Sequence, residues 1–159
     1  MAAESAVAAV CARRVSTYAL PMPYRHLLVI CDGSAEADDA VRAASELARR
    51  DRAKLTVAAV VELARSGRDC TGGASEWNAV LRDAARADLD RAAGILDSPA
   101  VFTVLYGEPA RAAAEGARVL GCDAIMLPAP SRRRLGRLFA RDRAPALRQR
   151  AACPVLQPR

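Results

Sequence analysis

The stretch that decides the fold is Tyr24 to Ser34, which reads YRHLLVICDGS. It contains a continuous apolar run of strand length, and such runs are typical of strands buried on both faces of a parallel sheet. Asp32 and Gly33 are turn residues, and Ser34 is a good N-cap for a following helix. The stretch therefore predicts a strand, a tight turn and the start of a helix.

The same alternation of strand and helix continues to the end of the chain. Apolar runs predict further strands at residues 55–61, 101–106, 124–127 and 155–156. In the helices between them, Ser75 is expected to cap a helix that buries Trp77, Pro109 and Gly121 are expected to start and stop the next, and Asp142 to cap a short last one. Alternating strands and helices predict a parallel sheet with right-handed crossovers and helices on both faces. We expect one three-layer α/β domain with five strands and about four helices over residues 24–159, preceded by a loosely ordered extension over residues 1–23.

Composition excludes several classes of protein. No apolar stretch is long enough to span a membrane, which predicts a protein that does not enter one. The five cysteines are widely spaced and form no C-x-x-C pair, so we expect idle thiols in a reducing cytoplasm rather than disulfides or a zinc site. His26 is the only histidine and precedes the apolar part of its strand, which argues against a Ser-His-Asp site with Ser34. We predict no catalytic residues and no metal site.

The positive charge is local. The chain has a formal net charge of +6, and residues 131–150 carry eight Arg and one Asp, or +7, so the remainder sums to −1. Arg132 and Arg133 belong to this cluster, which could hold a phosphate, meet an acidic protein partner or lie free in solvent. The lack of interleaved aromatic residues argues against nucleic acid.

Three short motifs stand out along residues 24–159: the first strand with Asp32-Gly33-Ser34, the helix entry Gly107-Glu108-Pro109-Ala110 and the closing strand Cys153-Pro154-Val155-Leu156. In this order and at these intervals, they resemble the universal stress protein family over nearly all of residues 24–159. The resemblance implies a sheet of order 3-2-1-4-5 and a homodimer formed through the last strand, at Val155 and Leu156. In one branch of the family it also implies ATP bound between the ends of the first and fourth strands.

The phosphate-binding motif of that branch, G-x2-G-x9-G-[ST], is degenerate in this sequence. Laying it after the fourth strand puts Pro128, Ser131, Arg141 and Asp142 at its four fixed positions. Pro128 has no N–H to offer a phosphate, and Asp142 places a carboxylate where a phosphate would lie. The usual ATP cradle is therefore predicted to be lost, and no cofactor is expected.

Two positions of the nucleotide-binding branch keep their residue type. Asp32 and Val60 match residues that contact the nucleoside, although Asp32 could instead bond the turn and Val60 could serve only the core. The candidate nucleotide or anion site is thus Asp32, Val60, Ser131, Arg132, Arg133 and Asp142. We predict a non-catalytic, dimeric stress-response domain. The alternative is a regulator that binds ATP or another adenine nucleotide, with Mg²⁺, through the Arg cluster.

Overall fold

The computed structural model describes residues 23–63, 73–130 and 144–158. They form a five-stranded sheet of order β3-β2-β1-β4-β5, in which every neighbouring pair of strands is parallel. The strands are β1 (His26–Cys31), β2 (Lys54–Val61), β3 (Val101–Tyr106), β4 (Ala124–Met126) and β5 (Val155–Leu156). The predicted α/β class and the predicted strand order are both confirmed.

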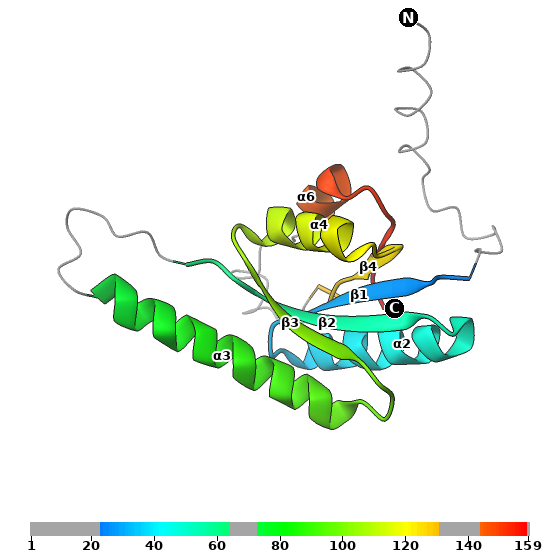
Figure 1. Cartoon of the computed structure of the whole chain (residues 1–159), viewed down its shortest axis with the longest axis horizontal. Coiled ribbons are helices and arrows are strands. Elements are labelled where there is room, and N and C mark those ends of the chain that lie inside the picture. The colour runs from blue at the N-terminus through cyan, green and yellow to red at the C-terminus, as the bar shows by residue number, and fades with distance from the viewer. Residues whose placement is uncertain (1–22, 64–72, 131–143, 159) are drawn as a thin grey trace, which may run out of the picture.

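Four helices of the described chain cover the two faces of the sheet. They are α2 (Ala35–Asp51), α3 (Gly73–Ile95), α4 (Pro109–Leu120) and α6 (Ala144–Arg150). Figure 1 shows α2 and α3 on one face and α4 and α6 on the other. Two buried clusters correspond to these layers, one joining α2 and α3 to the sheet and one joining α4 and α6 to it. The central strand β1 contributes to both, since Leu27 and Leu28, on opposite faces, are completely buried.

Local signals set the helix ends largely as predicted. The Ser34 hydroxyl accepts a hydrogen bond from the Ala37 N–H at 3.1 Å, which makes Ser34 the N-cap of α2. Pro109 lies in the first turn of α4, and Gly121 ends that helix with a φ of 67°. The predicted cap at Asp142 lies outside the described residues.

The prediction for α3 was wrong in two respects. The helix begins at Gly73, so Ser75 is inside it rather than at its cap, and Trp77 is 56% exposed rather than buried. The buried residues are Ala85, Leu89 and Ala92, in the second half of the helix. A helix of 23 residues is about 35 Å long, whereas the eight residues of β2 span about 26 Å. The first turns of α3 therefore extend past the sheet (Figure 1), and an apolar residue there has no core to enter.

Candidate functional site

The predicted ligand position lies where β1, β2 and β4 end. The strand registers pair Cys31 with Ala59 and Val29 with Met126. Asp32, the residue after β1, therefore lies beside Val60, the penultimate residue of β2. Pro128 comes two residues after the end of β4. In open parallel sheets ligands bind outside these ends, where the strand order reverses. The structure brings together the predicted residues Asp32 and Val60.

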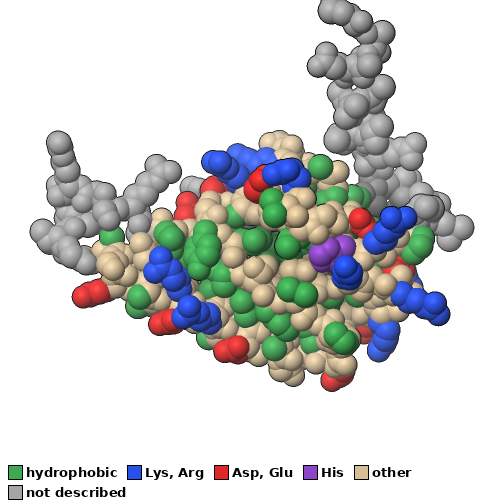
Figure 2. Space-filling view, viewed as in Figure 1, with side chains coloured by type: hydrophobic (Ala, Val, Ile, Leu, Met, Phe, Trp, Pro, Cys, Tyr) green, Lys and Arg blue, Asp and Glu red, His purple; other side chains and the backbone are tan. Residues whose placement is uncertain are grey.

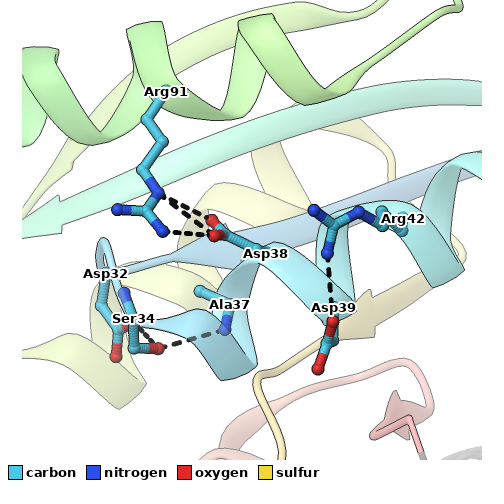
Figure 3. Close-up of polar contacts among 7 residues, drawn as sticks. All are labelled: Asp32, Ser34, Ala37, Asp38, Asp39, Arg42 and Arg91. Carbon is cyan, nitrogen blue, oxygen red and sulfur yellow. Dashed lines mark hydrogen bonds and ion pairs between the residues drawn. The ribbon is translucent and has the colours of Figure 1, made fainter.

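Asp32 organises the turn from β1 to α2 (Figure 3). Its carboxylate Oδ1 accepts hydrogen bonds from the Ser34 N–H at 3.2 Å and from the Ser34 hydroxyl at 2.6 Å. The Ser34 hydroxyl in turn accepts from the Ala37 N–H. This local bonding is what an Asp in a β–α turn commonly provides. A nucleotide contact by Asp32 stays a prediction, and one oxygen of the carboxylate already serves the turn.

Asp88, on α3, lies against this turn, a contact that no local sequence pattern predicts. A Cβ placed on Gly33, whose φ is +71°, would lie 2.2 Å from the Asp88 carboxylate oxygen Oδ1. Burial and the neighbouring charge of Asp32 raise the pKa of the Asp88 carboxyl, and Arg91 offsets this in part. Two carboxylates from different elements therefore meet beside the carboxyl end of β1.

Arg91 also ties α3 to α2 on the same side of the sheet. Its guanidinium donates from Nε to both carboxylate oxygens of Asp38 at 3.1 Å, and from a terminal nitrogen to one of them (Figure 3). The Asp38 side chain is 15% exposed, whereas the Arg91 side chain is 53% exposed. The pair fixes α3 over the start of α2 and so holds Asp88 next to Gly33.

The thiol at the end of β1 is not a nucleophile. Cys31 is buried, and burial together with the charges of Asp88 and Asp32 raises its pKa to about 12. Thiolates, not thiols, react with electrophiles, so this group stays protonated at neutral pH. His26 lies at the other end of β1, where its Nε2 is 2.8 Å from the hydroxyl of buried Thr56. Cys31 and His26 therefore lie at opposite ends of β1 and do not form a pair.

The backbone just after β4 is hydrogen-bonded by the side chain of Gln157, which follows β5. The Gln157 side-chain amide donates to the Pro128 carbonyl at 3.2 Å, and its own oxygen accepts from Arg148 at 2.9 Å. Pro128 has no N–H, so this residue offers no backbone donor to a phosphate. Gln157, like Asp88, was missed because a contact between residues so far apart leaves no local sequence signal.

Four of the predicted site residues, Ser131, Arg132, Arg133 and Asp142, lie outside the described residues. Val60 is described and is half-buried on the α4 side of the sheet, where it packs with the second core cluster. The described residues include no group of three or more His, Cys, Asp or Glu side chains placed to hold a metal ion.

A groove of about 700 Å³ opens beside α4, away from the predicted site. Leu105, Ala112, Gly116 and Val119 give it apolar walls, and Glu62, Glu108, Glu115 and Arg111 are its charged residues. Neither Asp32 nor Val60 lines it. The groove and the carboxyl end of β1 are thus separate features.

The comparisons with known proteins agree with this architecture. The model of the universal stress protein family matches residues 23–157. The chain belongs to the universal stress protein family. No curated protein sequence matches it. None of the described helices combines the length and the apolar character needed to cross a membrane.

Solved universal stress proteins share the fold. One from Burkholderia pseudomallei is 25% identical with a TM-score of 0.68, and the alignment covers 86% of this chain and 96% of that one. A protein from Archaeoglobus fulgidus, solved in complex with dAMP, is 21% identical with a TM-score of 0.57, covering 85% of this chain and 98% of that one. Another, solved in complex with cAMP, is 21% identical with a TM-score of 0.58, covering 84% and 96%.

Proposed function

We propose that this universal stress protein acts through protein contacts and does not hold ATP in the way of the family's ATP-binding branch. The observation that carries the proposal is Pro128 at the carboxyl end of β4. It lacks the N–H that a phosphate would need there, and its carbonyl accepts the Gln157 amide. A phosphate approaching Pro128 finds no N–H on this residue.

The charges beside β1 support the same conclusion. Asp88 lies against Gly33, the residue after Asp32, and burial and the charge of Asp32 raise the pKa of Asp88. Like charges about 4 Å apart repel by several kcal/mol at an effective dielectric constant near 20. A triphosphate brought to this turn would add negative charge to two carboxylates, and of the described cations here Arg91 is already engaged by Asp38.

Calorimetric titration of nucleotide-free protein with ATP and Mg²⁺ tests the proposal. We expect no binding with a Kd below about 100 μM. A companion variant restores the family motif by Pro128→Gly, Ser131→Gly, Arg141→Gly and Asp142→Ser, and it should gain affinity for ATP. Tight, magnesium-dependent binding by the unaltered chain would overturn the proposal.

A second candidate is a regulator that binds an adenine nucleotide through Arg132 and Arg133. Two neighbours of the same fold were solved with cAMP and with dAMP, so this fold can accept an adenine nucleotide in those proteins. If a nucleotide is found to bind, Arg132→Ala with Arg133→Ala should weaken it. Arg42→Ala with Arg86→Ala is the matched control, since both are exposed arginines on helix surfaces and the charge change is equal. Equal affinities in the two double variants would eliminate this candidate.

The homodimer through Val155 and Leu156 is part of the same proposal, as is an acidic protein partner at the Arg cluster. The outer edge of β5 has no partner strand within the described chain, which leaves it open to pairing. We also place the protein in the cytoplasm, because Cys31, Cys122 and Cys153 are free thiols. A monomer by light scattering at micromolar concentration would remove the dimer from the proposal.

A further inference from the structure

The opposite edge of the sheet, β3, is exposed and apolar. Within the described parts of the chain β3 pairs only with β2, and its six residues, VFTVLY, include no charge and no proline. Val101, Phe102 and Tyr106 are 61%, 39% and 54% exposed. Figure 2 shows apolar side chains gathered over β3 and between β3 and α4. Soluble proteins usually protect such an edge with a charge, a proline or a bulge, because it can pair with another strand.

The hydrogen bonds to β2 fix which backbone groups of β3 point outward. The Gly107 N–H donates to the Val61 carbonyl at 3.0 Å, and Leu105 is paired with Val60. In a parallel ladder alternate residues bond to the same neighbour, so the odd-numbered residues of β3 face β2. Phe102, Val104 and Tyr106 therefore present both their N–H and their C=O groups at the free edge.

We propose that this edge binds a second copy of the chain, with the two β3 strands antiparallel around a two-fold axis at Val104. Val104 then lies opposite Val104 of the second copy, and Phe102 lies opposite Tyr106 of the second copy. All three outward-facing residues form hydrogen-bonded pairs, giving about six bonds across the interface. A two-fold axis at Thr103 would give only about four, because Tyr106 would then fall outside the paired strand.

The side chains complement one another in this register. On the α3 face, Phe102 meets Tyr106 of the second copy, and cross-strand aromatic pairs stabilise antiparallel strands. On the α4 face, Val101 of the second copy lies opposite Gly107, which has no side chain to exclude it. Gly107 lines the groove together with Leu105 and Ala112, and a Cβ placed on Gly107 would lie 3.8 Å from the Ala112 Cβ, so this valine would face an apolar wall. The strand is thus self-complementary on both faces.

The edge at β3 offers a longer run of backbone groups than the edge at β5, which has two residues. The carbonyls of Pro154 and Leu156 accept bonds from β4, so of the two residues of β5 only Val155 points outward. Pro154 and Pro158 flank this short strand and shorten any ladder built on it. The two edges lie on opposite sides of the sheet, so pairing at β3 is independent of pairing at β5 and of nucleotide binding.

The expected association is weak. Taking about 200 Å² for an aromatic side chain, Phe102 and Tyr106 together offer about 190 Å² per copy. Specific stable interfaces bury about 800 Å² per partner. Val101 and the backbone of the free edge add to this area, but the total stays below about 800 Å² per copy. We therefore expect pairing at protein concentrations of tens to hundreds of micromolar.

A disulfide trap tests both the surface and the register. Directly opposed residues of a hydrogen-bonded antiparallel pair have Cα atoms about 5.5 Å apart, within the range that a disulfide spans. In a background with Cys11, Cys70 and Cys153 changed to Ser, Val104→Cys should form a covalent dimer with oxidised glutathione. Phe102→Cys alone should form no covalent dimer. An equal mixture of Phe102→Cys and Tyr106→Cys should form one, because these two positions are opposite each other.

The mixture also serves if Val104→Cys fails to fold, because Phe102 and Tyr106 are exposed. Trapping at Val104→Cys no greater than at Phe102→Cys, with no product from the mixture, would overturn the proposal, as would stronger trapping at Thr103→Cys.

Sedimentation of the chain without engineered cysteines provides a second test. Phe102→Lys should weaken concentration-dependent association at least about tenfold, because it places a charge in the paired strand. Val80→Lys is the matched control, since Val80 is 56% exposed on α3 and outside the strand. A mass that Phe102→Lys leaves unchanged at every concentration would contradict pairing at β3 and leave β5 as the route to any dimer.

Discussion

Replacing Gly33 by alanine should destabilise the fold through two separate effects. Gly33 adopts a φ of +71°, a left-handed conformation that costs an L residue with a Cβ about 1–2 kcal/mol. The new Cβ would also lie 2.2 Å from the Asp88 carboxylate oxygen Oδ1, so Asp88 must leave its position. Forcing a side chain off its rotamer costs about 0.5–1.5 kcal/mol. Together the two effects predict a loss of about 2.5 kcal/mol.

A double-mutant cycle separates these two effects. In an Asp88→Ala background the collision is absent, so Gly33→Ala should cost only the backbone term, and the two changes should couple by about 1 kcal/mol. Urea unfolding followed by circular dichroism measures all four chains, and the Tm of Gly33→Ala should fall by about 5–10 °C. Gly94→Ala is the control: its Cβ would meet nothing within 4 Å and its φ is not positive, so it should stabilise α3 slightly.

Two results would refute this reasoning. A loss below about 0.5 kcal/mol for Gly33→Ala would mean that the turn relaxes without cost to accept a side chain. An equal loss in the wild-type and Asp88→Ala backgrounds would mean that Asp88 does not occupy the space at Gly33. The second result would also weaken the electrostatic support for the proposed function, since that support needs Asp88 beside the turn.

Three further predictions concern other parts of the fold. Leu147 is 1% exposed and anchors α6, so Leu147→Ala should cost about 3 kcal/mol, whereas exposed Gln149→Ala should change the free energy of unfolding by less than about 0.5 kcal/mol in the same urea titration. Because the pKa of Asp88 is raised, folding favours its protonated form; Asp88→Asn should therefore raise Tm at pH 7, and the gain should vanish as the pH falls to about 4. The N–H groups of Ala110 and Arg111 lower the pKa of Glu108, so folding favours its charged form; Glu108→Gln should lower Tm at pH 7 and match wild type as the pH falls below about 4. A constant Tm difference across this pH range would contradict either assignment.

Much of the fold could be predicted from local signals in the chain. The continuous apolar run of β1 marks a strand with both faces buried, and Leu27 and Leu28 lie in the two different clusters. Ser34, Pro109 and Gly121 set helix ends because capping depends on neighbouring backbone groups alone. The prediction for Trp77 failed because an apolar stripe indicates which face of a helix is buried. The stripe does not indicate how far the sheet extends beneath that face.

The candidate site divides in the same way. The sequence by itself placed Asp32 at the end of a buried strand and Pro128 where the family's ATP-binding branch has glycine, because both follow from position along one chain segment. Only the tertiary structure decided that Asp88 fills the space at Gly33 and that the Gln157 amide donates to the carbonyl of Pro128. It also decided that β3 has an exposed apolar edge. All three features depend on residues far apart in sequence, which the packing of whole layers brings together or leaves exposed. No short motif encodes that packing.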